Sequence, residues 1–413
     1  MASVPISWVD PLAVFRSASE EHRQYWERPD DGVSVVGVGR ALRHTSGAFE
    51  SITSSARGIR TATVTEAKPT AFVAIPFDAR SAVPASLTIP EVAIQSSAGR
   101  STLTVSKLAD VESDLEAVVF GAGRLLDISR EPFSNAATVA PLSAEAPERK
   151  TWDELVKQAL SEVERGHLSK VVIARREVIR YRRSPDPGVA LDRLRQAYPS
   201  AAVFAVGDGD SVFFGASPER LVRVEGGKVS VDCLAGTAAR GATTETDRAI
   251  SDDLLRDDKN RREHAAVVEF VAGSLEPYCR DLDVDVTPSI RTLPNLHHLA
   301  TGVQGSLREK YGILDVAKAL HPTPAMAGVP RKQAVEFIHR HEGFDRGLYS
   351  GGIGWTDLEG NGEVTVAIRS ALLEADTATL YAGNGIVAGS DPASEWDETE
   401  LKLAPVRSAL NLS

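Results

Sequence analysis

The sequence predicts an α+β fold with antiparallel strands. Short β-rich runs separated by turn residues fill two distant stretches of the chain, residues 34–126 and 202–233. The helical segments stand apart from these hairpins, which disfavours a doubly wound parallel sheet. With 413 residues, 42% of them hydrophobic and 25% charged, the chain is typical of globular proteins and long enough for a large core.

Four runs predict strands in the first third of the chain: VSVVGV, TATVTEA, TAFVAIPF and STLTVSKL. The next segment, 134–150, is rich in Ala, Ser and Pro and lacks periodicity, so we interpret it as a connection between two lobes. The chain is therefore divided into an N-terminal lobe, residues 1–140, and a second region, residues 150–413.

The second region opens with a helix that we expect to start at Thr151 as N-cap, with Glu154 in the capping-box position. A strand, KVVIARREV, follows, and the runs of 202–233 are typical of an antiparallel meander. Residues 247–275 predict one long helix. The tail predicts strands in GEVTVAIRSALLEA and ATLYAGNGIV and a last helix from Pro392 to Leu410.

Composition excludes several classes of function. The net charge is −11 without a Lys/Arg run, which disfavours binding to nucleic acid or to anionic lipid. Cys233 and Cys279 are too few for a disulfide framework or a thiolate zinc site. Because no apolar stretch is typical of a signal peptide or reaches the roughly 18 residues of a membrane span, we expect a cytoplasmic protein.

Common catalytic motifs are missing from the sequence. The glycines of GNGIVAG have the wrong spacing for a dinucleotide fingerprint, and no P-loop, H-E-x-x-H or G-x-S-x-G motif occurs. The chemistry must then come from Glu, Lys, Arg and His.

Glu263 falls on the apolar face of its predicted helix, with Val267, Phe270 and Val271. A carboxylate buried there needs a cation. The alternative is that this helical turn extends past the core, so that Glu263 is solvated or paired with an arginine.

The last helix places Glu395, Glu398 and Lys402 on one face. They could form an ordinary surface cluster. However, the glycine-rich YAGNGIVAGSDP precedes the helix, whose start, capped by Ser390 or Asp391, would present backbone N–H groups to an anion. Two acids on separate helices could then hold a hard dication, with an anionic ligand completing its shell.

Three further residues are weak candidates by pattern alone. Lys170 begins a β-branched run, Glu219 lies in the turn-like SPE, and Arg369 interrupts an apolar strand. Their ordinary interpretations are a solvated edge residue, a simple turn and a salt bridge at the edge of the core.

The motifs between Leu168 and Leu403 resemble, in order, those of the chorismate-utilising enzymes, and within this family most closely the isochorismate synthases. They are KVVIARR, SPERLV, LAGTAARG, REHAAVVEFV, LHHLATGVQG, HPTPAMAG, FDRGLYSGGIGW, VAIRSALL, YAGNGIVAGSDP and EWDETELKL. The resemblance implies one large α+β fold like that of anthranilate synthase component I, with large antiparallel β-sheets covered by helices. The N-terminal lobe would be its more divergent part.

The resemblance also implies roles for individual residues. Lys170 matches the general base that activates water, and Glu219 matches the general acid that protonates the departing ring hydroxyl. Glu263 and Glu398 match the ligands of a magnesium ion that binds the ring carboxylate. The remaining residues implied to surround the substrate are Gly236, Thr237, His298, Ala325, Tyr349, Arg369, Gly383 and Lys402, with His298 chosen over His297 because its His-Leu step matches the family.

The same comparison implies which reaction is catalysed. Aminating relatives usually have Gln in place of Lys170 and depend on a glutamine amidotransferase, which we do not expect here. Ala325 and Ile368 favour release of isochorismate, whereas Tyr349 also occurs in salicylate synthases, which eliminate pyruvate as well. A binding module that only senses chorismate would need to have lost a catalytic group. We expect a monomer that acts on chorismate, its product serving menaquinone, catechol siderophore or salicylate synthesis according to neighbouring enzymes.

Overall fold

The fold is built on two large β-sheets in which every strand pair is antiparallel, as the sequence predicts. The computed structural model describes residues 1–18, 22–47, 49–59, 69–108, 121–127, 139–292 and 296–412. The predicted strand TATVTEA and the start of the 134–150 segment lie outside these residues.

The first sheet has twelve strands. In spatial order they are β1 (Ala2–Ile6), β8 (Arg100–Val105), β7 (Val92–Ser97), β3 (Val33–Val38), β2 (His22–Arg28), β11 (Ala202–Asp208), β12 (Ser211–Ser217), β21 (Ser370–Glu374), β22 (Thr377–Ile386), β10 (Lys170–Tyr181) and β18 (Gly328–Val329), with β9 (Pro141–Glu145) also paired to β10.

The second sheet has ten strands. In spatial order they are β15 (Cys279–Val284), β17 (Leu296–Leu307), β14 (Lys228–Ala239), β13 (Arg220–Glu225), β20 (Gly362–Val366), β19 (Gly352–Asp357), β5 (Thr70–Ile75), β6 (Ala85–Ile89) and β4 (Leu42–Ser46), with β16 (Ser289–Thr292) also paired to β17.

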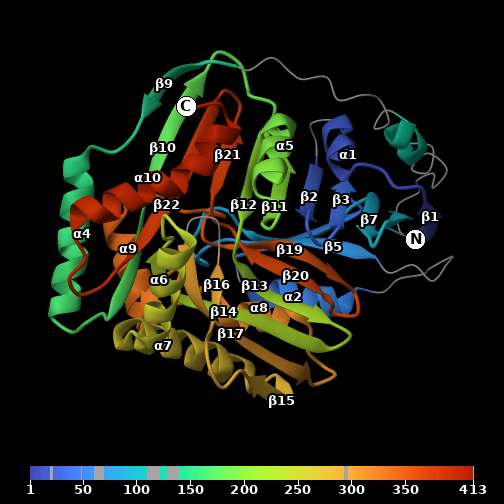
Figure 1. Ribbon diagram of the computed structural model, residues 1–413. Coiled ribbons are helices and arrows are strands. Elements are labelled where there is room, and N and C mark those ends of the chain that lie inside the picture. Colours follow the sequence, from blue (N-terminus) through green and yellow to red (C-terminus); the bar gives the residue numbers. More distant parts are fainter. Residues whose placement is uncertain are drawn as a thin grey trace.

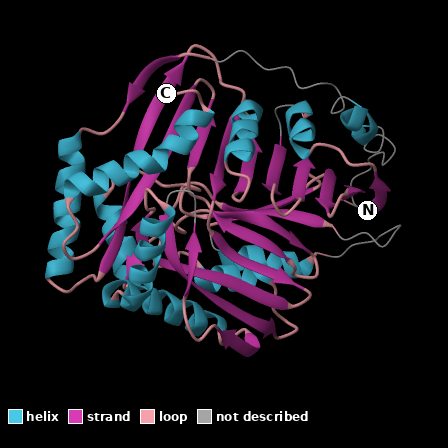
Figure 2. Cartoon of the chain, in the orientation of Figure 1, coloured by secondary structure: helices cyan, strands magenta, loops and turns pink. Residues whose placement is uncertain are grey.

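Helices cover the outer faces of both sheets (Figures 1 and 2). On the first sheet lie α1 (Pro11–Ser17), α4 (Arg149–Glu164), α5 (Pro187–Ala197), α9 (Arg331–His341) and α10 (Pro392–Ala409); on the second lie α2 (Phe49–Gly58), α6 (Thr244–Arg256), α7 (Asp258–Leu275) and α8 (Ile313–Leu320). Between the two sheets a separate core includes Trp26, Phe72, Phe204 and Tyr349. The predicted helix-covered α+β architecture is confirmed.

Strands from both parts of the chain share each sheet. In the first sheet β2 pairs with β11, and in the second β5 pairs with β19. Residues 1–140 therefore complete the same sheets that carry the candidate residues, and β9 continues the pairing inside the segment that was expected to be an irregular connection.

The last helix begins as its sequence predicts. Asp391 is the N-cap and accepts a hydrogen bond from the Ser394 backbone N–H, and Pro392 occupies the first turn. Thr399, Leu403 and Val406 face the core. Figure 1 shows this helix, in red, lying across β22 and β10.

Two helix predictions are wrong in detail. α4 starts at Arg149, so Thr151 lies inside the helix, and Trp152 and Val156 are buried. The predicted single helix at 247–275 is two helices, α6 and α7, because Asp257 adopts an extended conformation and its carboxylate caps α7 by accepting from the Asn260 backbone N–H. A local hydrogen bond thus competes with continuation of the helix.

Two strand predictions join segments that belong to different sheets. The expected meander at 202–233 is two hairpins, β11–β12 in the first sheet and β13–β14 in the second. The expected single strand around Arg369 is β20 of the second sheet followed by β21 of the first. The chain therefore passes from one sheet to the other between Ser217 and Arg220 and again between Val366 and Ser370.

None of the helices in the described part of the chain is long and apolar enough to cross a membrane.

Candidate active site

Two of the segments in which the chain passes between the sheets, 218–219 and 367–369, lie side by side and carry Glu219 and Arg369. The carbonyl oxygen of Glu219 accepts from the Val366 backbone N–H at 3.0 Å and from the Thr365 hydroxyl at 2.6 Å. The carbonyl oxygen of Arg369 accepts from the Ala216 backbone N–H at 3.2 Å. These bonds hold together two backbone segments that are far apart in sequence, one carrying an acidic and the other a cationic side chain.

Arg369 occupies a strained backbone position at its crossing. Its φ of 53° lies in the left-handed region, which an arginine seldom adopts. This conformation separates it from β20 and β21, so Arg369 does not lie within an apolar strand as the sequence predicted. Burial lowers the pKa of Arg369, while the nearby charges of Glu398 and Glu219 raise it.

Glu219 sits among positive charges in a desolvated setting. Burial among the surrounding atoms raises the pKa of Glu219, and the charges of Arg369, Lys170 and Lys402 oppose this rise. A carboxyl group whose pKa is raised retains its proton at higher pH and can donate it. Arg369, Lys170 and Lys402 therefore all lie within electrostatic range of the Glu219 carboxyl group.

Lys170 is the first residue of β10, where the strand enters the sheet. Its Nζ lies 3.4 Å from Oε1 of Glu263 on α7. The side chain runs past Gly385 of β22, where a Cβ would come within 2.4 Å of Lys170 Cε. Lys170 is thus an inward-directed strand-entry residue with an acidic partner, and it is not the freely solvated edge residue of the ordinary interpretation.

Lys402 joins α10 to β22. Its Nζ donates to the Gly383 carbonyl at 3.0 Å and to Asn384 Oδ1 at 2.5 Å, and it lies 2.6 Å from Glu398 Oε1. Burial lowers the pKa of Lys402, whereas the Glu398 carboxylate raises it. Three acceptors satisfy the three N–H groups of the ammonium and hold the charge in place.

Glu395, Glu398 and Lys402 lie on one face of α10, as the helical spacing predicts. Burial raises the pKa of Glu395, and the neighbouring Glu398 carboxylate raises it further. The Asn384 side-chain amide donates to the Glu395 carbonyl at 2.6 Å. β22 reaches Ile386, so most of the glycine-rich segment that precedes this helix is strand and only residues 387–391 form a loop.

Gly236 forms a bulge in β14 that positions Thr237. The strand register shifts between Ala235 and Thr237, and Gly236 has a φ of 76°. The Thr237 hydroxyl lies 3.0 Å from Nδ1 of His298, and its backbone N–H donates to Asn260 Oδ1 at 3.3 Å. The bulge thereby docks on the first turn of α7, one turn before Glu263.

The two adjacent histidines face different surroundings. His297 is buried and bonds to Asp247 of α6 at 2.8 Å. Burial lowers the pKa of His298, and the charges of Arg369 and Lys402 lower it further. His298 therefore lies beside Thr237 and within electrostatic range of Arg369 and Lys402, whereas His297 is buried against α6.

Tyr349 packs between the sheets near Gly383. Its ring stacks on Tyr381 with centroids 5.2 Å apart, and its hydroxyl lies 3.0 Å from the position that a Cβ on Gly383 would take. Burial raises the pKa of Tyr349 and keeps its hydroxyl protonated. Ala325 and Ile368 both pack against the core of the second sheet, partly accessible.

The two proposed metal ligands remain accessible. The side chain of Glu263 is 40% exposed and that of Glu398 55%, so Glu263 lies at the edge of the core and not within it, paired with a lysine instead of an arginine. Among the described residues there is no group of three or more His, Cys, Asp and Glu side chains placed to hold a metal. A dication bound here would need oxygen atoms from the substrate and from water, which suits magnesium.

Three site residues escaped the sequence analysis: Asn260, Asn384 and Gly385. Asn384 is a buried polar side chain within an otherwise apolar strand, and Gly385 shares a strand face with Gly383. These two signals were readable in the sequence, whereas the contact of Asn260 with the bulge depends on the packing of α7 against β14.

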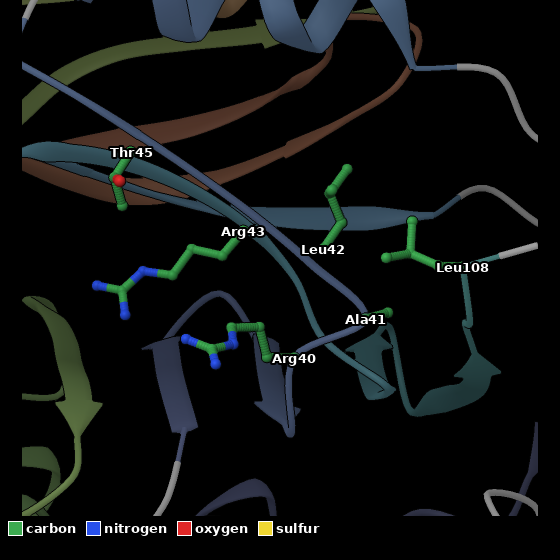
Figure 3. Close-up of a pocket in the computed structure, with 6 residues that line it drawn as sticks. All are labelled: Arg40, Ala41, Leu42, Arg43, Thr45 and Leu108. Atoms are coloured by element: carbon green, nitrogen blue, oxygen red, sulfur yellow. The ribbon is translucent and has the colours of Figure 1, made fainter. Parts of the chain in front are cut away.

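A separate surface pocket lies away from this site. It is lined by Arg40, Ala41, Leu42, Arg43, Thr45 and Leu108, and Figure 3 shows the guanidinium groups of Arg40 and Arg43 directed to the same side. Arg43 is paired with Asp208. The pocket contains none of the predicted site residues.

The two-sheet fold agrees with the comparison to known proteins. The model of the chorismate binding enzyme family matches residues 1–411. The chain belongs to this family.

Particular relatives are similar over most of the chain. A salicylate-biosynthesis isochorismate synthase of Pseudomonas aeruginosa is 35% identical, with 99% of this chain and 90% of that protein covered. The isochorismate synthase MenF of Bacillus subtilis is 36% identical, with 78% and 69% covered. The solved structure of MenF, the menaquinone-specific isochorismate synthase of Escherichia coli, superposes with a TM-score of 0.85 at 28% identity, with 99% and 94% covered.

Proposed function

We propose that this chain is an isochorismate synthase, an isomerase that converts chorismate reversibly to isochorismate by adding water and releasing a ring hydroxyl. Its similarity to several isochorismate synthases supports this activity. The observation that carries the chemistry is that the Glu219 carboxyl group, whose pKa is raised by burial, lies within electrostatic range of Lys170, Arg369 and Lys402. An acid and a base in one cluster of cations suit a substrate with two carboxylates.

In the proposed reaction Lys170 acts as the general base. It removes a proton from the water that attacks the ring carbon next to the carboxylate-bearing carbon. Glu219 donates a proton to the ring hydroxyl on the opposite face, which leaves as water while the ring double bonds shift. One water enters and one leaves, so the net change is an isomerisation.

Other residues would bind and orient the substrate. Arg369 and the backbone at Gly383 are proposed to hold the enolpyruvyl carboxylate, because a guanidinium group matches a carboxylate in geometry and charge. Gly236 and Thr237 would approach the hydroxyl side of the ring. The remaining wall of the site would come from His298, Tyr349 and Ala325.

We propose Mg²⁺ as the metal, held by Glu263 and Glu398. Both side chains offer carboxylate oxygens, remain partly exposed and lie beside the two site lysines, which fits a hard cation that shares its shell with substrate and water. When bound, the ion would neutralise the ring carboxylate and orient the ring. Lys402 holds Glu398 in place from the side of β22.

We further propose that the protein acts as a cytoplasmic monomer without a glutamine amidotransferase subunit. Water as the nucleophile needs a base such as Lys170 but needs no ammonia supply. The catalytic residues would all lie in the region 150–413, with residues 1–140 completing the sheets.

The test is product analysis. The purified protein is incubated with chorismate and Mg²⁺, with and without added isochorismate-pyruvate lyase, and the products are separated by chromatography. Isochorismate that becomes salicylate only when lyase is added is the expected result. A Lys170→Ala preparation, purified in the same way, controls for contaminating enzymes.

Salicylate formed without lyase would instead assign the protein as a salicylate synthase. Absence of turnover would contradict both enzymatic assignments and leave a chorismate-binding module.

A further inference from the structure

Among the residues that the structure describes, β10 has no strand partner along part of one edge, close to Lys170. On its inner edge β10 pairs with β22 from Val171 to Arg180. On its outer edge β18 pairs only with Lys170 and Val171, and β9 pairs only from Val178 onward. The backbone groups between these two short strands need other partners.

The side chains of Arg346 and Glu342 supply two of these partners. Arg346 Nη2 donates to the Val172 carbonyl at 2.7 Å, and Glu342 Oε1 accepts from the Ala174 backbone N–H at 2.8 Å. The two side chains also bond to each other, with Arg346 Nε 2.8 Å from Glu342 Oε2. Both are almost fully buried, with 2% and 0% of the side chain exposed.

Arg346 also reaches two other segments of the candidate site. Its Nη1 donates to the Met326 carbonyl at 3.1 Å, directly after Ala325, and the Ala327 carbonyl accepts from the Val172 N–H at 2.9 Å. The carbonyl of Arg346 accepts from the Tyr349 backbone N–H at 2.9 Å. Arg346 therefore links β10 and the segment around Ala325 through its guanidinium group, and the turn that carries Tyr349 through its backbone carbonyl.

We propose that the Glu342–Arg346 pair is a positioning device that sets Lys170 relative to the substrate pocket. The pair bonds to the edge of β10 at Val172, two residues from Lys170, and at Ala174, and its other contacts hold the segments that carry Ala325 and Tyr349. Neither side chain touches the reacting groups, so both act through the residues that they hold. This inference rests on the proposed role of Lys170 as the base.

The planar fork of arginine explains the residue type. The guanidinium group is planar, and each of its three nitrogen atoms donates to a different partner: Nε to Glu342, Nη2 to Val172 and Nη1 to Met326. A lysine would keep the charge but could not reach the same partners with the same geometry. Arg346 is thus expected to tolerate conservative substitution poorly.

The test compares a charge-neutral double variant, Glu342→Gln with Arg346→Met, with a matched control. The control is Glu336→Gln with Arg340→Met, which removes an exposed pair of the same i,i+4 spacing. The measured quantities are kcat and KM for chorismate and the melting temperature. We expect kcat of the first double variant to fall roughly 100-fold with a smaller change in KM, because displacement of a catalytic group by about 1 Å has an effect of this size.

The same double substitution in a Lys170→Met background separates positioning from general damage. If the pair acts through Lys170, the double substitution should lower kcat far less in the Lys170→Met background than in the wild type. An equal fold-loss in both backgrounds, or an unchanged kcat in the folded double variant, would overturn the inference. Turnover retained by Lys170→Met alone would instead reject the assignment of Lys170 as the general base. If the double variant does not fold, Arg346→Lys carries the same comparison.

Discussion

As a general base Lys170 must lose a proton, and as a general acid Glu219 must hold one, and the two side chains lie in different surroundings. Lys170 lies at a strand entry beside an acidic side chain, and Glu219 lies desolvated where the chain crosses between sheets. Each substitution to Ala should lower turnover by roughly two to four orders of magnitude, the usual contribution of acid–base catalysis. Steady-state kinetics with chorismate measure this, and near-normal turnover in Lys170→Ala would exclude it as the base.

Glu263 and Glu398 should affect the metal requirement. Glu263→Gln and Glu398→Gln each remove a charged ligand while keeping the size of the side chain, so a higher Mg²⁺ concentration should be needed for half-maximal activity. The measurement is a Mg²⁺ titration of activity at saturating chorismate. Glu336→Gln serves as a control on a different helix, and titrations that coincide with the wild type would reject both ligands.

Glu219 should also make stability depend on pH. Because burial raises its pKa, the native state holds the proton more strongly than the unfolded chain does, in which a glutamate has a pKa of about 4.3. The free energy of unfolding contributed by Glu219 is therefore lost as pH rises from the unfolded-state pKa to the raised native pKa. Above the native pKa the loss stays constant.

Glu219→Gln mimics the protonated form and removes this loss. The melting temperature of the variant, relative to the wild type, should increase as pH is raised from about 4 towards neutrality. Thermal unfolding across this range tests it, with the exposed Glu225→Gln as control. A difference that does not change with pH would contradict the raised pKa.

At the scale of elements, two glycines of β22 leave room for side chains of the candidate site. Gly383 leaves room for the Tyr349 hydroxyl, and Gly385 leaves room for the Lys170 side chain. The alternation of a strand places both glycines on one face, so that one strand supports the base and the wall of the pocket together.

Gly385→Ala should displace Lys170 with little damage to the sheet. The added Cβ would lie 2.4 Å from Lys170 Cε, so the lysine side chain must move, and kcat should fall by roughly 10- to 100-fold. The matched control is Gly207→Ala in β11, where the Cβ would meet the flexible Arg23 side chain at 2.9 Å away from the site. Equal kcat values for the two variants would show that Gly385 does not set the position of Lys170.

Capping was predicted correctly for α10 but wrongly for α4, and the interruption of the predicted helix at 247–275 was missed. The Asp391 cap was expected because Ser, Asp and Pro occur directly before an amphipathic run. The break at Asp257 was missed because an aspartate within a charged helix also suits the solvent face, and only its bond to Asn260 shows that it caps a new helix.

At the scale of the whole molecule, a buried ion pair joins the two sheets. Glu363 of β20 bonds to Arg28 of β2 and, at 3.0 Å, to Arg220 of β13. Glu363 is 3% exposed. The pair therefore connects the N-terminal segment of the first sheet to the second sheet.

Glu363→Gln should destabilise the whole fold. It leaves the buried Arg28 without its carboxylate, which costs about 3 kcal/mol or more. Denaturant unfolding should show this as one shifted transition, because strands of both chain segments share each sheet. Glu225→Gln should change the stability by less than about 0.5 kcal/mol, and a similarly small effect of Glu363→Gln would contradict the role of the pair.

The sequence by itself determined the fold class, most strand and helix positions and the unusual acids and bases, because periodicity, capping and motif order are local signals. The tertiary structure alone decided which strands share a sheet. It split the predicted meander and the strand around Arg369 between two sheets, and it thereby placed Glu219 beside Arg369. Sheet partners are chosen by hydrogen bonds between residues distant in the chain, and no local pattern encodes that choice.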